Sequence, residues 1–485
     1  MASKHESILN YALNVVHIRG FFTLLKKTFS ILLLFSLIFT TVTVQADEVE
    51  DRKWEDEIIY SLIVDRFYNG NSENDFEVNM KDINSYNGGD FAGIEKRLDY
   101  LRDMGFTVIQ LSSIFENEDG GYHGQWITDY YSPEQHFGTM KEFNKLVKAA
   151  HDKGMKIILE FPVLTNYSNT DIQDAAKWWV ENTEIDGYKI PNVKSRSIEF
   201  WKQFIEIMKQ ENENFYVSAQ DKVLSDTDMK ALYSAGFDGV STISLVQPLR
   251  DAFSNTNKSA QSLLELTKEN SDLSGIQEVF FDNKDTTRFT RDMVESGAFP
   301  GSSWKLALTY LYTQPSVPVI FYATEIAVNG GEAPENIPLM NFRTDEELID
   351  FITDLGKVRQ EQPALTRGSM DILHEDNGLI AFKRQYESDT VVVVINNTDV
   401  DQNFIIPASD LEDEKELRGL LGTDLVRSDN GEYKIFIDRE GMEIYKLTDK
   451  SGINVWFIIA LFAVFGSFIL FMYIAWKRGK NRIPE

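Results

Sequence analysis

Three strand-like runs follow one another in the middle of the chain: KIILEF at 156–161, GYKI at 187–190 and FYVS at 215–218. Between them, residues 175–180 and 200–208 carry apolar side chains at the i, i+3, i+4 spacing of a helix that packs through one face. Short buried strands that alternate with amphipathic helices are typical of a parallel sheet. This stretch therefore predicts strand–helix–strand–helix–strand order, which decides the fold class as α/β.

The same alternation extends to both sides of this stretch. Five further strands are expected at 58–64, 108–111, 239–243, 277–281 and 317–322. Helical spacing recurs at 146–151 and 304–311. Eight strands, each followed by a helical pattern, fit a closed (β/α)8 TIM barrel better than a doubly wound sheet. We assign this barrel to residues 47–363.

After Pro363 the helical patterns disappear. Strands without intervening helices are expected at 380–384, 390–396, 403–406, 433–437 and 442–447. This pattern predicts a C-terminal antiparallel β-sandwich domain over residues 364–448. The acidic cluster at 410–416 is interpreted as a solvated loop.

The N-terminal region has the pattern of a secretory signal peptide. Lys26 and Lys27 precede an apolar run at 29–39, and small residues at 44–46 precede an acidic stretch. We expect a signal peptide over residues 1–46, with an uncleaved anchor as the alternative.

The C-terminal region has the pattern of a membrane anchor. Residues 455–475 contain no charged side chain, which is long enough for one transmembrane helix, expected at 453–476. A basic tail at 477–485 follows, and the positive-inside rule places such a tail in the cytoplasm. The chain is therefore predicted to be a single-pass protein of the cell membrane with a large extracytoplasmic N-terminal domain.

Composition excludes several classes of function. The 48 basic and 76 acidic residues give a formal net charge of −28, which opposes nucleic-acid binding. The chain has no cysteine, so disulfides, thiol catalysis and cysteine-ligated metals are excluded.

Three segments resemble the ends of the fourth, fifth and seventh barrel strands of the α-amylase family, glycoside hydrolase family 13. They read DGYKIPNV at 186–193, FYVSAQD at 215–221 and FFDNKD at 280–285, where the family has roughly DG[FY]R[LI]D, F[LF]xGE and F[LI]DNHD. The resemblance implies a nucleophilic Asp at Pro191, an acid/base Glu at Gln220 and a sugar-binding His at Lys284. Of the catalytic carboxylates it implies, only Asp285 remains.

These substitutions remove the groups that the reaction needs. A retaining glycosidase uses two carboxyl groups about 5–5.5 Å apart, one as nucleophile and one as acid/base. Pro191 has no nucleophilic atom, and Gln220 has no proton to donate at neutral pH. Asp221 is expected to point away from Gln220, because neighbouring strand residues face opposite sides. Glu160 is expected to pair with Lys189 as part of the barrel structure.

The remaining sugar site is also incomplete. GYHGQW at 121–126 resembles the family's YHGYW, with Gln125 where the resemblance implies a Tyr stacked on the sugar. His123, Trp126, Asp285 and Arg288 are retained as candidate substrate-binding residues, or alternatively as an internal network. Only 164–174 separates the third strand from its helix, where the family has a long insertion, so we expect a short inserted region and a shallow cleft.

One implied metal site is complete in sequence. NGNSEND at 69–75, followed by GGD at 88–90, resembles the calcium loop of cyclodextrin glucanotransferases and related amylases. The resemblance implies a structural Ca²⁺ held by Asn69, Asn71, Asn74, Asp75, the carbonyl of Gly88, and Asp90. Calcium prefers such oxygen ligands. The alternative is an Asn- and Gly-rich turn without metal.

Three hypotheses for function follow. The first is a membrane-anchored, catalytically inactive α-amylase homologue that acts by binding a protein partner. The second is a surface protein that binds an α-glucan. The third is an active α-glucan hydrolase or transferase of carbohydrate metabolism with a rebuilt active site.

Overall fold

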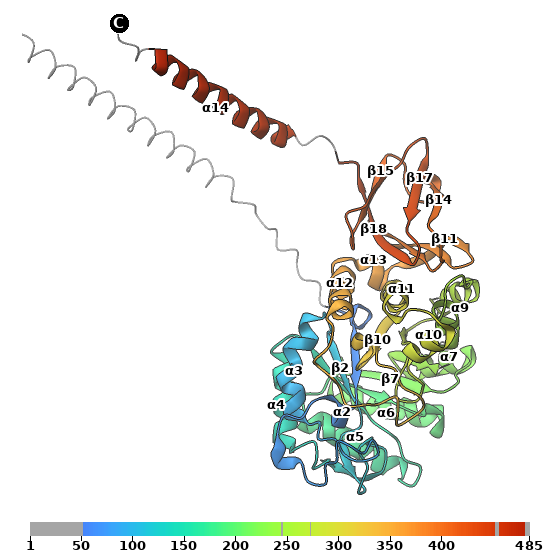
Figure 1. Ribbon diagram of the computed structural model, residues 1–485. Coiled ribbons are helices and arrows are strands. Elements are labelled where there is room, and N and C mark those ends of the chain that lie inside the picture. Colours follow the sequence, from blue (N-terminus) through green and yellow to red (C-terminus); the bar gives the residue numbers. More distant parts are fainter. Residues whose placement is uncertain (1–51, 244–245, 272, 452–454, 481–485) are drawn as a thin grey trace, which may run out of the picture. The chain divides into compact units, whose positions relative to one another are not determined.

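The computed structural model describes residues 52–243, 246–271, 273–451 and 455–480 (Figure 1). The predicted signal peptide at 1–46 lies outside the described residues. The first residues predicted for the barrel, 47–51, and the end of the basic tail, 481–485, also lie outside them.

Eight parallel strands close into a barrel in the order β1-β10-β9-β8-β7-β6-β5-β2, as predicted. Their bounds are β1 (Ile59–Leu62), β2 (Val108–Leu111), β5 (Lys156–Glu160), β6 (Gly187–Ile190), β7 (Tyr216–Asp221), β8 (Gly239–Thr242), β9 (Ile276–Val279) and β10 (Val317–Phe321). A short hairpin, β3 (Phe115–Asn117) with β4 (Ile127–Pro133), projects after β2.

Helices surround the barrel, and each predicted helical segment lies within one of them. Their bounds are α2 (Val64–Phe67), α3 (Phe91–Asp103), α4 (Met140–His151), α5 (Asn169–Asn182), α6 (Ile198–Glu211), α7 (Asp226–Ala235), α8 (Val246–Phe253), α9 (Gln261–Ser271), α10 (Phe289–Ser296), α11 (Pro300–Thr313), α12 (Glu347–Glu361) and α13 (Pro363–Arg367). The segment between β5 and α5 is short, as expected. It is shorter than the sequence indicated, because Ser168 caps α5 by accepting a hydrogen bond from the Asp171 backbone.

The barrel interior has an apolar layer and a polar layer. Ile59, Val108 and Ile158 form part of a buried apolar cluster inside the barrel. Nearer the C-terminal ends of the strands the inward side chains become polar, including Lys189 and Glu278. Active sites of TIM barrels lie at this C-terminal face, so the polar layer marks the region to examine for function.

The C-terminal domain is an antiparallel sandwich. A six-stranded sheet has the order β11-β12-β13-β18-β15-β16, and β14 pairs with β17 in a second sheet. The bounds are β11 (Ser369–Asp376), β12 (Leu379–Tyr386), β13 (Asp389–Asn396), β14 (Gln402–Pro407), β15 (Lys415–Gly419), β16 (Leu425–Arg427), β17 (Glu432–Ile437) and β18 (Gly441–Asp449). Val392, Val394, Ile406 and Ile435 join the two sheets in one buried cluster.

Three strands of this domain, β11, β15 and β16, were not expected from the sequence. The interpretation of 410–416 as a loop is wrong at its end, because β15 begins at Lys415. Glu416 is buried and accepts hydrogen bonds from Arg418 and Arg427 on β15 and β16. A carboxylate that looks solvated in sequence is therefore an internal partner for two guanidinium groups.

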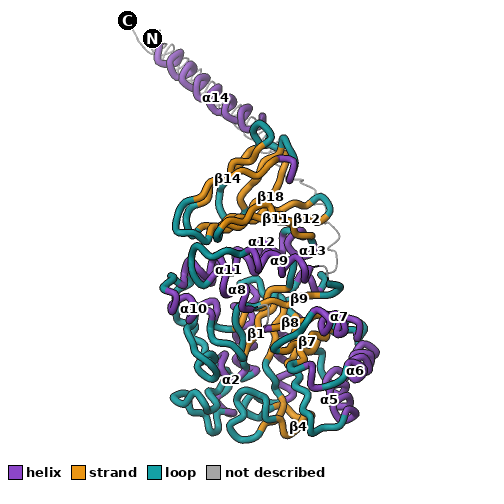
Figure 2. Tube along the Cα trace, turned by 90° about the vertical axis from the view of Figure 1, so that its right-hand side faces the viewer, coloured by secondary structure: helices purple, strands orange, loops and turns teal. Residues whose placement is uncertain are grey.

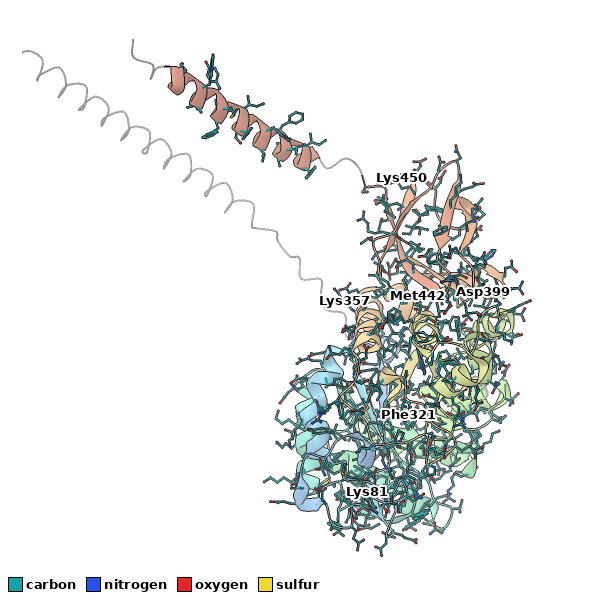
Figure 3. The ribbon with its side chains drawn as sticks, viewed as in Figure 1. Lys81, Phe321, Lys357, Asp399, Met442 and Lys450 are labelled. Carbon is teal, nitrogen blue, oxygen red and sulfur yellow. The ribbon has the colours of Figure 1, made fainter. Side chains whose placement is uncertain are left out.

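The other face of the six-stranded sheet packs on barrel helices (Figure 2). Phe382 and Val393 belong to the same buried cluster as barrel residues, and Met442 of β18 packs against that cluster (Figure 3). Two fully buried arginines add polar contacts. Arg384 donates to the carbonyls of Thr313, Gly368 and Ser369, and Arg359 donates to those of Glu55, Tyr312, Leu365 and Ser316. The sheet thus packs on the helices α9, α11 and α13.

The last helix, α14 (Val455–Lys480), is long and apolar enough to cross a membrane. Its segment Phe457–Lys477 has a mean hydropathy of 2.6, and none of its most apolar window is buried. The helix continues through Lys480, so the expected cytoplasmic tail begins as a continuation of the helix rather than as a separate segment.

Candidate functional site

The positions to which the resemblance assigns the nucleophile and the acid/base lie at the C-terminal ends of adjacent strands. Pro191 directly follows β6 and is buried, and Gln220 is near the end of β7. Gln220 lines a cavity of only about 20 Å³ together with Lys189 and Glu278. That volume holds about one water molecule, so a sugar ring does not fit within it.

Asp285 lies in the loop between β9 and α10 and is exposed. Its backbone N–H donates to the side chain of Asn283. Among the described residues its carboxylate has no hydrogen bond or ion pair, and its charge acts on Lys284. Asp285 therefore remains available to a ligand from solvent.

Lys284 occupies the position where the resemblance implies a sugar-binding His, and it forms an ion pair. Its Nζ lies 2.5 Å from Oε1 of Glu160 at the end of β5, and both side chains are largely buried. Burial by itself would lower the pKa of Lys284, but the charges of Glu160 and Asp285 offset it, so the pKa is raised. Lys284 therefore stays charged, and Glu160 is its partner in the ion pair.

A second ion pair crosses the barrel interior. Lys189 of β6 pairs with Glu278 of β9, and both are almost completely buried. Lys189 also donates to Ser241 at 2.6 Å, and the Tyr216 hydroxyl donates to Glu278 at 2.8 Å. The expected pair between Glu160 and Lys189 is therefore wrong. The two residues are register partners on the neighbouring strands β5 and β6, but Lys189 pairs with Glu278 of β9 and Glu160 pairs with Lys284.

Two further carboxylates at this end of the barrel are also engaged. Asp282 accepts hydrogen bonds from the Phe289 backbone and from Thr324. Asp221 accepts from the backbone N–H groups of Lys194 and Lys222, on the side of β7 away from Gln220. These bonds hold loops in place, so neither carboxylate replaces the missing catalytic group.

His123 and Trp126 lie together on the loop between β3 and β4. Their rings meet edge to face with centroids 4.6 Å apart, and Trp126 is 51% exposed. Burial lowers the pKa of His123, and the charge of Lys284 lowers it further. His123 is thus a neutral hydrogen-bonding group near Lys284, beside an indole ring that solvent can reach.

Arg288 does not lie with these residues at the surface. It is fully buried, donates to the carbonyl of Asn336 at 2.6 Å, and its guanidinium lies over the Phe321 ring. The prediction of a substrate contact is corrected here, because a guanidinium without exposed surface supports the loops and does not reach a ligand.

The implied calcium loop brings three of its residues together. The Asn69 amide donates to both carboxylate oxygens of Asp75 at 2.8 Å. Gly88 lies against them: a Cβ on it would be 2.7 Å from the Asn69 amide nitrogen and 3.0 Å from Asp75. Asn74 contributes a buried amide oxygen without a hydrogen-bond partner among the described residues. An unpaired oxygen and a carboxylate in one loop suit an oxygen-ligated cation.

Asp90 and Asn71 have other bonds in this loop. Asp90 caps α3 and accepts backbone N–H groups from Gly70, Asn71 and Gly93. Burial raises the pKa of Asp90, and the nearby charge of Asp75 raises it further. The Asn71 amide oxygen accepts from Glu73 and its nitrogen donates to Glu142, so Asn71 does not face the other implied ligands. The described part of the chain contains no group of three or more His, Asp or Glu side chains that could hold a different metal ion.

Glu278 is the residue of this site that sequence reasoning missed. A signal was present, because strand alternation places Glu278 on the inward side of a buried strand. A buried carboxylate requires a partner, and Lys189 is an inward-facing lysine one position before the end of its own strand. Only the closed barrel shows that the two meet.

Comparison with known proteins gives a consistent result over both domains. A family model described as "Alpha amylase, catalytic domain" matches residues 61–177, and one described as "Alpha-amylase C-terminal domain" matches residues 368–445. The solved α-amylase of Anoxybacillus is 40% identical with a TM-score of 0.80, covering 83% of this chain and 100% of its own. That of Geobacillus thermoleovorans, solved with acarbose, is 36% identical with a TM-score of 0.78 and the same coverage.

A further relative is longer than this chain. The β/α-amylase of Paenibacillus polymyxa is 26% identical over 466 residues, which cover 81% of this chain and 38% of that protein. The chain therefore spans little more than a third of the length of that relative.

The buried pair Lys189–Glu278 leads to a test of stability. Lys189→Met should lower the free energy of unfolding by about 3–5 kcal/mol, because it leaves a buried carboxylate without its cation. The double variant Lys189→Met/Glu278→Leu should recover most of this loss. Chemical denaturation of the purified protein measures both.

The matched control is Lys148→Met, which breaks the exposed pair with Asp152 and should change stability by less than about 1 kcal/mol. A Lys189→Met protein no less stable than this control would contradict the role assigned to the buried pair.

Proposed function

The chain belongs to the α-amylase family, glycoside hydrolase family 13, and from this premise we propose that it is a membrane-anchored member that has lost glycoside hydrolysis and acts by binding. The proposed ligand is a protein partner or an α-glucan at the exposed barrel mouth, outside the cell. The observation that supports the loss of catalysis is the use of the remaining carboxylates: Glu160 and Glu278 are each neutralised by a buried lysine.

The chemistry of the reaction explains why this use supports the proposal. Hydrolysis with retention needs a carboxylate that can attack and a second carboxyl group that can give and take a proton. Several carboxylates at the barrel mouth are described above. Among the described residues, Asp285 is the one of these whose carboxylate has no hydrogen bond or ion pair. One carboxylate supplies neither the pair nor the required geometry.

The mouth keeps features suited to binding. The Trp126 indole is half exposed beside neutral His123, and Asp285 is exposed in the adjoining loop. An exposed aromatic ring near hydrogen-bonding groups suits either a sugar ring or an aromatic hot spot of a protein interface. The segment between β5 and α5 is short where the family has a long insertion, and this leaves the surface open to a large partner.

A rate assay tests the loss of catalysis. With maltooligosaccharides the purified protein should release no reducing sugar above a buffer blank, since loss of general acid catalysis alone reduces rates by about 10²–10⁴. The variant Pro191→Asp/Gln220→Glu/Lys284→His should also fail to reach the rate of an authentic α-amylase run in parallel. Gln125 and the small cavity still prevent placement of the sugar.

The alternative, an active enzyme with a rebuilt site, predicts the opposite outcome. Turnover by the unmodified chain that is abolished by Asp285→Asn or Glu160→Gln would establish it. Turnover that survives both variants points to a contaminating enzyme, which a mock purification identifies.

The proposed anchor is α14, supported by its length and apolarity. The full chain should remain in membranes after alkaline carbonate extraction, and a chain truncated after Lys450 should be released.

Because the chain has no cysteine, Ser409→Cys gives a single thiol on the C-terminal domain. It should react with a membrane-impermeant maleimide on intact cells, whereas a cysteine placed after Lys480 should react only after lysis; the reverse pattern contradicts the proposed topology.

We also propose a structural calcium ion in the loop of Asn69, Asn74, Asp75, Gly88 and Asp90, where it would neutralise two neighbouring carboxylates. Calcium at about 100 times its Kd should stabilise the protein by about 2.7 kcal/mol, measured as a rise in Tm that a chelator reverses. The rise should diminish at acidic pH, because a protonated carboxyl group does not bind the ion and burial raises the pKa of Asp90.

Asp75→Asn should remove this calcium response, and Asp119→Asn, a change at an exposed aspartate of another loop, should retain it. A Tm that ignores both calcium and chelator would leave the loop as a turn without metal.

A further inference from the structure

The hairpin of β3 and β4 presents two large aromatic rings to solvent. Trp126, which directly precedes β4, is 51% exposed, and Tyr131 within β4 is 44% exposed. Trp178 of α5 is partly exposed, and its ring meets the Tyr131 ring edge to face with centroids 5.6 Å apart. The hairpin and α5 lie near the same end of the barrel (Figure 2). Exposed rings that are grouped in this way are typical of binding surfaces.

The hairpin is fixed against α5 and the segment before it. The Trp179 indole of α5 donates a hydrogen bond to the carbonyl of Tyr130. The Tyr167 hydroxyl donates to the carbonyl of Thr128 at 3.3 Å. The backbone that carries the exposed rings is therefore held in place before any ligand arrives, which lowers the entropy that binding would cost.

Uncompensated negative charge surrounds these rings. The stretches 103–140 and 157–176, which contain the hairpin and the beginning of α5, have no Lys or Arg. Six acidic side chains of these stretches are exposed or partly exposed, and within the part of the chain that the structure describes none of them forms an ion pair. They are Glu116, Glu118, Asp119, Asp129, Asp171 and Asp174.

Two of these carboxylates are placed opposite each other. Glu116 and Asp129 are register partners across β3 and β4, and like charges opposite each other in an antiparallel pair are destabilising. Burial raises the pKa of Glu116, and the charges of Glu134 and Asp129 raise it further. Asp129 accepts hydrogen bonds from neutral groups, the Tyr131 backbone and the Ser132 hydroxyl. A cation from outside the described chain would offset this repulsion.

The carboxylates lie close to the rings themselves. Burial raises the pKa of the Tyr131 hydroxyl, and the charges of Asp174 and Asp171 raise it further. The backbone N–H of Glu118 donates to the carbonyl of Trp126 at 2.9 Å, so these two residues are neighbours across the hairpin. A guanidinium group can stack on an aromatic face and pair with carboxylates at the same time. The combination of rings and carboxylates therefore suits arginine side chains.

We propose that this acidic aromatic face, formed by Trp126, Tyr131 and Trp178 with the six carboxylates named above, binds an arginine-rich segment of a protein partner. The proposal rests on the proposed function, since it names the kind of partner that is bound at the barrel mouth. A glucan has no positive charge and would leave the repulsion between the carboxylates in place. An arginine-rich segment offsets it, and electrostatic attraction also speeds the encounter.

Calorimetry on the full chain in nanodiscs of zwitterionic lipid, at physiological salt, tests this face. The probe is a synthetic dodecapeptide that alternates Arg and Gly, and one peptide should bind per chain. Glu118→Gln/Asp129→Asn should weaken this binding about fivefold or more, because it removes two of the carboxylates that the guanidinium groups pair with.

The matched control is Glu269→Gln/Glu361→Gln, which removes the same charge from exposed positions on α9 and α12. It should change the affinity less than about twofold, since exposed charges at a distance are screened by salt. An equal loss in both double variants would show attraction by the net charge of the chain alone, and it would overturn the proposal. Absence of peptide binding overturns it as well.

The contribution of the rings is tested separately. Trp126→Leu keeps an apolar side chain and every charge, so it should reduce the preference for the Arg peptide over one that alternates Lys and Gly. Phe299→Leu changes an exposed ring elsewhere on the barrel and should bind both peptides as the unmodified chain does. An unchanged preference in Trp126→Leu would contradict the stacking that we assign to this ring.

Maltooligosaccharides identify the other occupant. If they bind, if Trp126→Leu abolishes that binding, and if no Arg peptide binds, the face takes a glucan and this proposal is overturned while the proposed loss of catalysis stands. Turnover in the rate assay would instead overturn the proposed function and leave the measured peptide binding as it is.

Thermal unfolding supplies a second readout. Glu116→Gln keeps an acceptor for the hydrogen bond from Gln135 but removes the repulsion with Asp129. It should therefore raise the Tm of the peptide-free protein and weaken peptide binding. A lowered Tm together with peptide binding at the level of the unmodified chain would show that Glu116 has a structural role only, which contradicts its place in the face.

Discussion

The ion pair between Lys189 and Glu278 is the interaction on which the rest of the barrel centre depends. A barrel of eight strands must fill its own interior with side chains, and a buried charge persists there only when it is paired and hydrogen-bonded. Tyr216 and Ser241 provide the additional hydrogen bonds. The pair therefore joins β6 to β9 across the interior and fills the space beneath Gln220.

The second pair, between Lys284 and Glu160, extends this arrangement to the rim. Proline and glutamine stand at the positions where the resemblance implies reactive carboxyl groups, and lysines neutralise Glu160 and Glu278. A site built for catalysis holds its charged groups ready for substrate, whereas these two carboxylates form internal contacts. This arrangement is the physical support for the proposal that the protein acts by binding.

The C-terminal domain is held against the barrel by apolar packing and by two buried guanidinium groups that bind carbonyls at the end of α11 and around it. Cations are favourable at the C-terminal end of a helix, where carbonyls lack partners.

The order of elements, the eight barrel strands, most strands of the second domain and the apolar C-terminal helix could be predicted from the amino-acid sequence. These follow from periodicity, which is a local property that the chain carries wherever it folds. Its prediction that Pro191 and Gln220 stand at catalytic positions comes from the resemblance of short motifs, which is likewise read without knowledge of the partners. The folded chain was needed to show that Lys189 meets Glu278, that Lys284 meets Glu160 and that Arg288 is buried. Each of these depends on residues tens of positions apart that meet when the barrel closes, and local sequence does not contain that information.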